Sequence, residues 1–103
     1  MKIKEKQIPL GSEKDIIKLK FYLHKGEVIR VSIALVCEIN EAEECILRYD
    51  CSHGFLHKDL CYAKPARKEV IHENLNHIFV NNTISHLKKN FEKYKHYYKE
   101  NYL

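Results

Sequence analysis

Long apolar runs are absent from this chain. The longest one, Val31 to Cys37, already contains a serine and falls far short of the roughly 20 residues that cross a bilayer. The N-terminal segment MKIKEKQ also lacks the apolar core of a secretory signal. We therefore expect no membrane contact and a cytoplasmic location.

Cysteine pairing motifs are absent as well. The chain has four cysteines, which are Cys37, Cys45, Cys51 and Cys61. Their spacing forms neither a CxxC pair nor a dense disulfide framework. In a reducing compartment such cysteines are expected to be free thiols that pack as small apolar side chains. Proline is scarce too, with two residues, which suits the interior of a sheet.

Length and charge bound the class of protein. With 103 residues, of which 45% are hydrophobic, the chain can build one core but not two. The formal charge of +4 permits a polyanion partner without requiring one. We expect an N-terminal arm or irregular edge over residues 1–14 and a single α+β domain over residues 15–103.

Period-two alternation of apolar and polar residues predicts strands from residue 16 onward. The second strand would run along EVIRVSIALVCEI, residues 27–39. A three-residue loop at residues 24–26 would place Phe21 opposite Ile29 and bring the apolar faces together. A two-residue turn would split them, so we predict the three-residue loop.

Two further turns complete a meander of about four antiparallel strands. A polar turn over residues 40–44 would pair Ile39 with Cys45, on the apolar face. A tight turn at His53 and Gly54 would then return the chain along FLHKDLCY.

The periodicity becomes helical after Pro65. A first apolar stripe runs from Ile71 to Ile78. A longer stripe joins Val80, Ile84, Leu87, Phe91, Tyr94 and Tyr98. Because the phase slips near Asn81, we expect one or two C-terminal helices, which would cover one face of the sheet.

The stretch RYDCSHGFLH, residues 48–57, concentrates polar side chains around the third turn. In the predicted register Asp50 lies opposite His57 and Arg48 opposite Asp59, on the face away from the helices. The Asp50 carboxylate would then accept a hydrogen bond from His57 and fix its tautomer. The neighbouring strand offers short side chains that would form a shallow floor: Ser32, Ala34 and Val36.

Two interpretations of this polar face stay open. Opposite charges across strands also occur on an ordinary solvated sheet, where each pair contributes roughly a few tenths of a kcal/mol. A functional interpretation is favoured by His53, because asparagine or aspartate is the usual residue at such a turn.

An arginine, a tyrosine and an aspartate in a row are followed by two histidines, at Arg48, Tyr49, Asp50, His53 and His57. This pattern resembles the RYD motif and downstream histidines of small toxin-like proteins of the TumE type. The order of strands followed by a helix is compatible with that family. The resemblance implies a toxin that pairs with a helix-turn-helix antitoxin and targets RNA.

The corresponding hypothesis is RNA cleavage without a metal. His57, oriented by Asp50, would remove the proton of a ribose 2′-hydroxyl, and His53 would protonate the leaving 5′-oxygen. Arg48 would stabilise charge on the phosphate. The further residues expected to contact the substrate are Tyr49 and Lys58.

No metal or other cofactor is expected. The helical histidines His72 and His77 are five residues apart, so they would not share one face of a helix.

The alternative hypothesis is a non-enzymatic module that binds protein or nucleic acid. Its surface would be the sheet face or the C-terminal helix, whose lysines and tyrosines would contact phosphates and bases. The lysines are Lys88, Lys89, Lys93, Lys95 and Lys99. A cysteine enzyme using Cys51 or Cys61 with a histidine is a third hypothesis. An exposed strand edge would also allow a homodimer by sheet extension.

Overall fold

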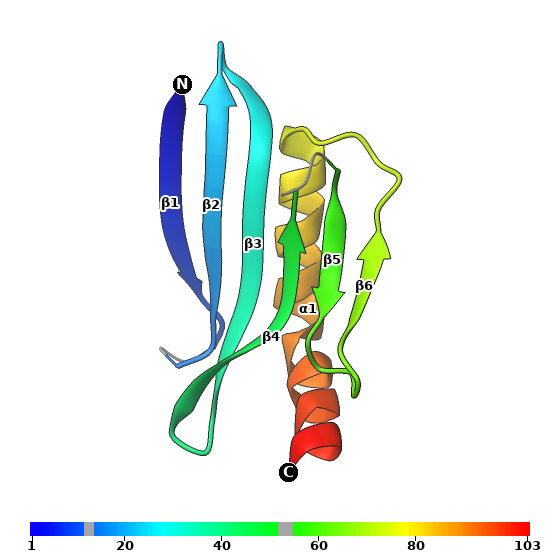
Figure 1. Ribbon diagram of the computed structural model, residues 1–103. Coiled ribbons are helices and arrows are strands. Elements are labelled where there is room, and N and C mark those ends of the chain that lie inside the picture. The colour runs from blue at the N-terminus through cyan, green and yellow to red at the C-terminus, as the bar shows by residue number, and fades with distance from the viewer. Residues whose placement is uncertain (12–13, 52–54) are drawn as a thin grey trace.

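The computed structural model describes residues 1–11, 14–51 and 55–103, which form a six-stranded antiparallel sheet and one helix (Figure 1). The strands are β1 (Lys2–Pro9), β2 (Ile16–His24), β3 (Glu27–Ile39), β4 (Ala42–Asp50), β5 (His57–Leu60) and β6 (Arg67–Val70), and the helix is α1 (His77–Tyr102). Each strand pairs with the next one along the chain. The predicted α+β class and antiparallel meander are confirmed, but the sheet has six strands rather than about four.

The two strands that sequence analysis missed lie at the edges of the sheet. β1 occupies most of the predicted arm and pairs with β2 along its whole length, from Lys2 opposite Leu23 to Pro9 opposite Ile16. β6 follows the chain reversal after β5. Nearly every residue of both strands is exposed, so neither carries the apolar alternation that marks a half-buried strand.

The first hairpin closes with a two-residue turn, so the predicted three-residue loop is wrong. Lys25 and Gly26 both have positive φ, at 51° and 80°, which matches the twist of a two-residue hairpin. A bulge at Ile29 then shifts the register and places Phe21 opposite Val31. The bulge keeps the apolar faces together in spite of the short turn.

The second hairpin also combines a two-residue turn with a bulge. Asn40 and Glu41 form its turn at φ values of 51° and 68°, so the predicted pairing of Ile39 with Cys45 is wrong. A bulge between the two strands follows, and Ile46 is fully buried. Cys45 consequently lies outside the core.

The C-terminal segment forms one continuous helix, which agrees with the prediction of one or two helices and excludes a break near Asn81. The Asn76 side chain accepts a hydrogen bond from the Phe79 backbone N–H at 2.9 Å and so fixes the start of α1. Ile71 and Leu75 of the first predicted stripe therefore precede the helix, whereas Ile78 lies in its first turn. The longer predicted stripe does pack against the core, as the burial of Leu87 shows.

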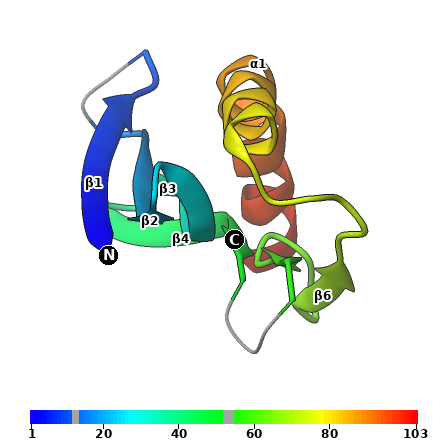
Figure 2. The same ribbon diagram turned by 90° about the horizontal axis from the view of Figure 1, so that it is seen from above.

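α1 covers one face of the sheet, and the sheet curves around it with β1 and β6 at its two ends (Figure 2). The helix contacts β3 and β4 most closely. Side chains buried between the two layers include Ile17, Ile33, Leu35, Leu47 and Leu87. Within residues 1–11, 14–51 and 55–103, no helix or strand covers the face of the sheet away from α1, which is here called the outer face.

A buried carboxylate ties the helix to the sheet. Asp15 is 7% exposed, and its Oδ2 lies 2.8 Å from Lys95 Nζ while its Oδ1 accepts the Glu38 backbone N–H at 3.2 Å. The hydrogen bond to Asp15 raises the pKa of Lys95, whereas the partial burial of Lys95 lowers it to a smaller extent. Lys95 thus holds the fold together rather than joining the exposed lysines of α1.

Replacing Lys95 with methionine is expected to lower the free energy of unfolding by about 2 kcal/mol, because the Asp15 carboxylate would stay buried without its cation. Lys89→Met, at an exposed position of the same helix, is the matched control and should change it by about 0.5 kcal/mol or less. Urea denaturation followed by circular dichroism measures both. Equal stability of the two variants would show that the Asp15–Lys95 contact does not hold the helix in place.

Candidate functional site

The pairing of β4 with β5 places the polar side chains of the RYD stretch. Arg48 lies opposite Asp59 and Asp50 opposite His57, which is the predicted register. Residues two apart on a strand point to the same side, so all four belong to one face. They lie on the outer face, with Tyr49 and its partner on the helix side.

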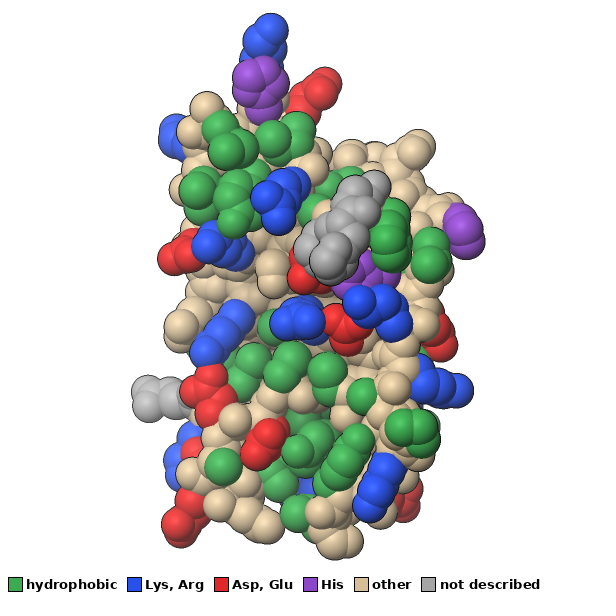
Figure 3. All heavy atoms as spheres, viewed as in Figure 1, with side chains coloured by type: hydrophobic (Ala, Val, Ile, Leu, Met, Phe, Trp, Pro, Cys, Tyr) green, Lys and Arg blue, Asp and Glu red, His purple; other side chains and the backbone are tan. Residues whose placement is uncertain are grey.

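Two rows of directly opposed residues cross the outer face of all six strands. One row contains Gln7, Lys18, Ala34, Arg48, Asp59 and Lys68. The other contains Glu5, Lys20, Ser32, Asp50, His57 and Val70. Figure 3 shows charged side chains of both signs across the middle of this face, between groups of hydrophobic ones.

Asp59 is the centre of the charged groups in these rows. Its Oδ2 accepts hydrogen bonds from Arg48 Nη2 at 2.9 Å and Arg48 Nε at 3.3 Å, and its Oδ1 lies 3.9 Å from Lys68 Nζ. The Asp59 side chain is 16% exposed, whereas that of Arg48 is 47% exposed. The hydrogen bond to Asp59 raises the pKa of Arg48 against the opposing effect of partial burial. Arg48 is therefore anchored at one end and open to solvent.

His57 is buried next to this pair. Only 1% of the residue is exposed, and Nε2 lies 3.8 Å from Asp59 Oδ2. The Phe55 ring packs against it with centroids 5.3 Å apart. Among the described residues, Nδ1 has no hydrogen-bond partner. The carboxylate of Asp59 thus lies close to the ring, and the predicted partner Asp50 lies opposite His57 in the pairing of β4 with β5.

Two predicted substrate-binding residues lie on the wrong face for that role. Tyr49 is 8% exposed and its ring meets that of Phe79 edge-on, with burial raising its pKa to about 12. Lys58, opposite Tyr49, lies beside His86 on the helix side and pairs with Glu69 at 3.6 Å. A ligand in contact with Arg48 would not reach either residue. The predicted acid, His53, lies outside the described residues.

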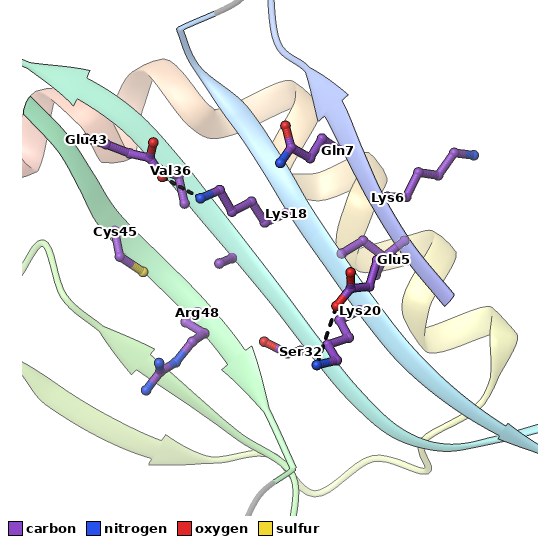
Figure 4. Close-up of a pocket in the computed structure, with 12 residues that line it drawn as sticks. Glu5, Lys6, Gln7, Lys18, Lys20, Ser32, Val36, Glu43, Cys45 and Arg48 are labelled. Atoms are coloured by element: carbon purple, nitrogen blue, oxygen red, sulfur yellow. Dashed lines mark hydrogen bonds and ion pairs between the residues drawn. The ribbon is translucent and has the colours of Figure 1, made fainter. Parts of the chain in front are cut away.

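A cavity of about 540 Å³ opens on the outer face next to Arg48. Its floor consists of the predicted short side chains, Ser32, Ala34 and Val36. Figure 4 shows Lys18 and Lys20 from β2 on one side of the floor, and Arg48 from β4 on the other. The Arg48 guanidinium is directed toward β5, as its bond to Asp59 requires.

The lysines of this cavity were not among the predicted site residues. Lys18 pairs with Glu43, and Lys20 Nζ lies 3.4 Å from Glu5 Oε1. Both lysines alternate with the apolar residues of β2, a pattern that places them on the polar face of the strand. What sequence analysis lacked was the register that places them across Ser32 and Ala34 from Arg48.

The chain matches the model of a known family over nearly its whole length. The family model described as Domain of unknown function (DUF7718) matches residues 1–102. The chain belongs to the DUF7718 family. No curated protein and no solved structure was found to match this DUF7718 chain.

No group of three or more His, Cys, Asp or Glu side chains within residues 1–11, 14–51 and 55–103 is arranged to hold a metal ion. No helix in the same ranges combines the length and apolar composition needed to cross a membrane.

Proposed function

We propose that this DUF7718 protein binds single-stranded RNA on the outer face of its sheet. The observation that carries the proposal is the cavity beside Arg48, where short side chains form a floor between cations from two strands. RNA is the target that the resemblance to TumE-type toxins implies. A toxin role, with a helix-turn-helix antitoxin as partner, belongs to the same proposal.

The charge of the cavity suits a phosphate backbone. Three cationic side chains from the outer face line it, Lys18, Lys20 and Arg48, against the two carboxylates of Glu5 and Glu43. The ion pairs among them are exposed, and such pairs are worth roughly 1 kcal/mol or less. Phosphate groups can therefore compete for these cations.

Arg48 keeps donors available for a phosphate. Its bond to Asp59 uses Nε and Nη2, and a guanidinium carries further N–H groups in the same plane. Asp59 holds the planar group in place, which lowers the entropy cost of binding. Arg48 is thus the residue expected to contribute most to RNA affinity.

Replacing Arg48 with glutamine is expected to weaken binding of a short labelled single-stranded RNA. The slope of log affinity against log salt concentration should also become less steep by about 0.7, because one phosphate contact is lost. Lys18→Gln should act in the same way without breaking the bond to Asp59. Fluorescence anisotropy at several NaCl concentrations measures the affinities and the slope.

Lys58→Gln is the matched control. It removes a positive charge on the helix side of the sheet, at the position opposite Tyr49, the residue that follows Arg48. The proposal requires Lys58→Gln to retain wild-type binding. It is wrong if Lys58→Gln weakens binding as much as Arg48→Gln does, or if the wild-type protein binds no RNA at low salt.

RNA cleavage without a metal is the second candidate function. The observation that favours it is the His57 ring, with Asp59 beside Nε2 and no partner for Nδ1 among the described residues. Nδ1 would accept the 2′-hydroxyl proton, the 2′-oxygen would attack phosphorus, and the 5′-oxygen would leave with a proton from His53. Because the ring is 1% exposed, the side chains that cover it would have to move before RNA reached Nδ1.

His57→Gln is expected to reduce cleavage by about 100-fold or more, measured as release of fragments with 2′,3′-cyclic phosphate ends in the presence of EDTA. His86→Gln is the control, because His86 is a histidine on the helix side whose Nε2 lies 2.7 Å from the Tyr94 hydroxyl. Circular dichroism verifies that both variants fold. Undiminished cleavage by His57→Gln would exclude His57 as the base, and absence of cleavage by the wild-type protein would leave RNA binding as the function.

A further inference from the structure

Cys45 lies at the edge of the outer cavity, and Cys61 is its neighbour on the adjacent segment. Cys45 belongs to β4, and Cys61 follows the last residue of β5. The Tyr62 backbone N–H donates to the Ile46 carbonyl at 2.9 Å, so the two segments are joined directly next to the cysteines. The two thiols are close enough to influence each other's ionisation, and both are free and partly exposed.

The surroundings of the pair are polar and cationic. Cys45 lines the outer cavity together with Arg48 (Figure 4). Each thiol also contacts a backbone carbonyl, with Cys45 Sγ 3.9 Å from the Leu47 oxygen and Cys61 Sγ 3.7 Å from the Asp59 oxygen. The sulfur atoms are therefore held in place near a fixed positive charge.

The two thiols differ in acidity. The hydrogen bond from Cys45 lowers the pKa of Cys61 to about 7, against the opposing effects of burial and of Asp59, and Arg48 adds to the lowering. The same hydrogen bond, together with burial, raises the pKa of Cys45. Near neutral pH Cys61 thus supplies the thiolate and Cys45 retains its proton.

The other two cysteines have structural surroundings. Cys37 is fully buried, and burial raises the pKa of its thiol to about 12. Cys51 Sγ accepts the Val31 backbone N–H at 2.9 Å and lies 3.5 Å from the Val31 carbonyl oxygen, so it bridges to β3. Cys45 and Cys61 differ from both, because they are partly exposed neighbours and Cys45 lines the outer cavity.

We propose that Cys45 and Cys61 form a thiol–disulfide exchange site that reacts with anionic low-molecular-weight disulfides of the glutathione class. The Cys61 thiolate attacks one sulfur of the disulfide, forms a mixed disulfide and releases one small thiolate. Cys45 then loses its proton to that thiolate or to water, and its sulfur attacks Cys61 Sγ. This step releases the second small thiol and leaves a Cys45–Cys61 disulfide. Two protein thiols are oxidised and one small disulfide is reduced to two thiols.

The cations of the cavity favour an anionic reagent. Lys18, Lys20 and Arg48 surround the approach to Cys45, so the carboxylates of glutathione disulfide would be attracted there. A neutral disulfide of similar reactivity would lack this attraction. The preference distinguishes a site from indiscriminate oxidation of exposed thiols.

The test treats the reduced full-length protein with glutathione disulfide near neutral pH and follows its mass and its remaining thiols. The wild-type protein is expected to lose two hydrogen atoms and two alkylatable thiols, with the new bond mapped by peptide mass to Cys45 and Cys61. Cys45→Ser should retain one glutathione on Cys61, because the resolving thiol is missing. Cys61→Ser should react at least about tenfold more slowly than the wild-type protein, because the attacking thiolate is missing.

Hydroxyethyl disulfide serves as the neutral comparison and should react more slowly than glutathione disulfide at low salt, with the difference falling as salt rises. The proposal is overturned if the bond maps to another pair, if Cys45→Ser also loses its adduct, if Cys61→Ser reacts like the wild type, or if the neutral reagent is as fast. The assay contains no RNA, so its failure leaves the proposed RNA binding intact, and failure of RNA binding leaves the dithiol proposal intact.

Discussion

The pairing of β4 with β5 is the constraint on which the outer face depends. With Arg48 opposite Asp59, every second residue of both strands points away from α1 and the residues between them enter the core. A slip of one residue between the strands would move Tyr49 out of the core opposite Asp59, a change that the buried contact of Tyr49 with Phe79 opposes. Core packing on one side thus holds the charged groups in register on the other.

This constraint separates two roles that the RYD stretch combines in three consecutive positions. The tyrosine is a core residue, whereas the arginine and the aspartate belong to the outer face. Arg48, Asp59 and His57 then interact across the two strands instead of with their neighbours in sequence. The buried pair of strands therefore supports a polar surface that extends over β2 and β3.

Sequence periodicity predicted the fold class, the β4–β5 register and the short-side-chain floor, because each follows from alternation on a half-buried strand. It could not predict the bulges at Ile29 and Ile46. A bulge shifts pairing while leaving the apolar residues on the same face, so turn length cannot be judged from face matching alone. β1 and β6 are exposed on both sides and carry no periodic signal.

The sequence analysis did not predict β6, and this omission also explains why the predicted histidine site differs from the one in the structure. With four strands, β5 would be an edge and His57 would be open to solvent. In the structure β6 places Val70 opposite His57, and the ring lies buried beside Asp59. The partner of an imidazole is set by such local packing, which a register does not specify.

The most direct test of the central claim, that RNA binds the outer face, is a methyl NMR titration of the folded protein with a short single-stranded RNA. The Ala34 methyl lies on the cavity floor, whereas the methyl groups of Ile84 lie on α1. The account predicts a saturable shift of the Ala34 signal with the Ile84 signals unchanged. Shifts confined to Ile84 and other α1 methyl groups, with Ala34 unmoved at saturating RNA, would contradict it.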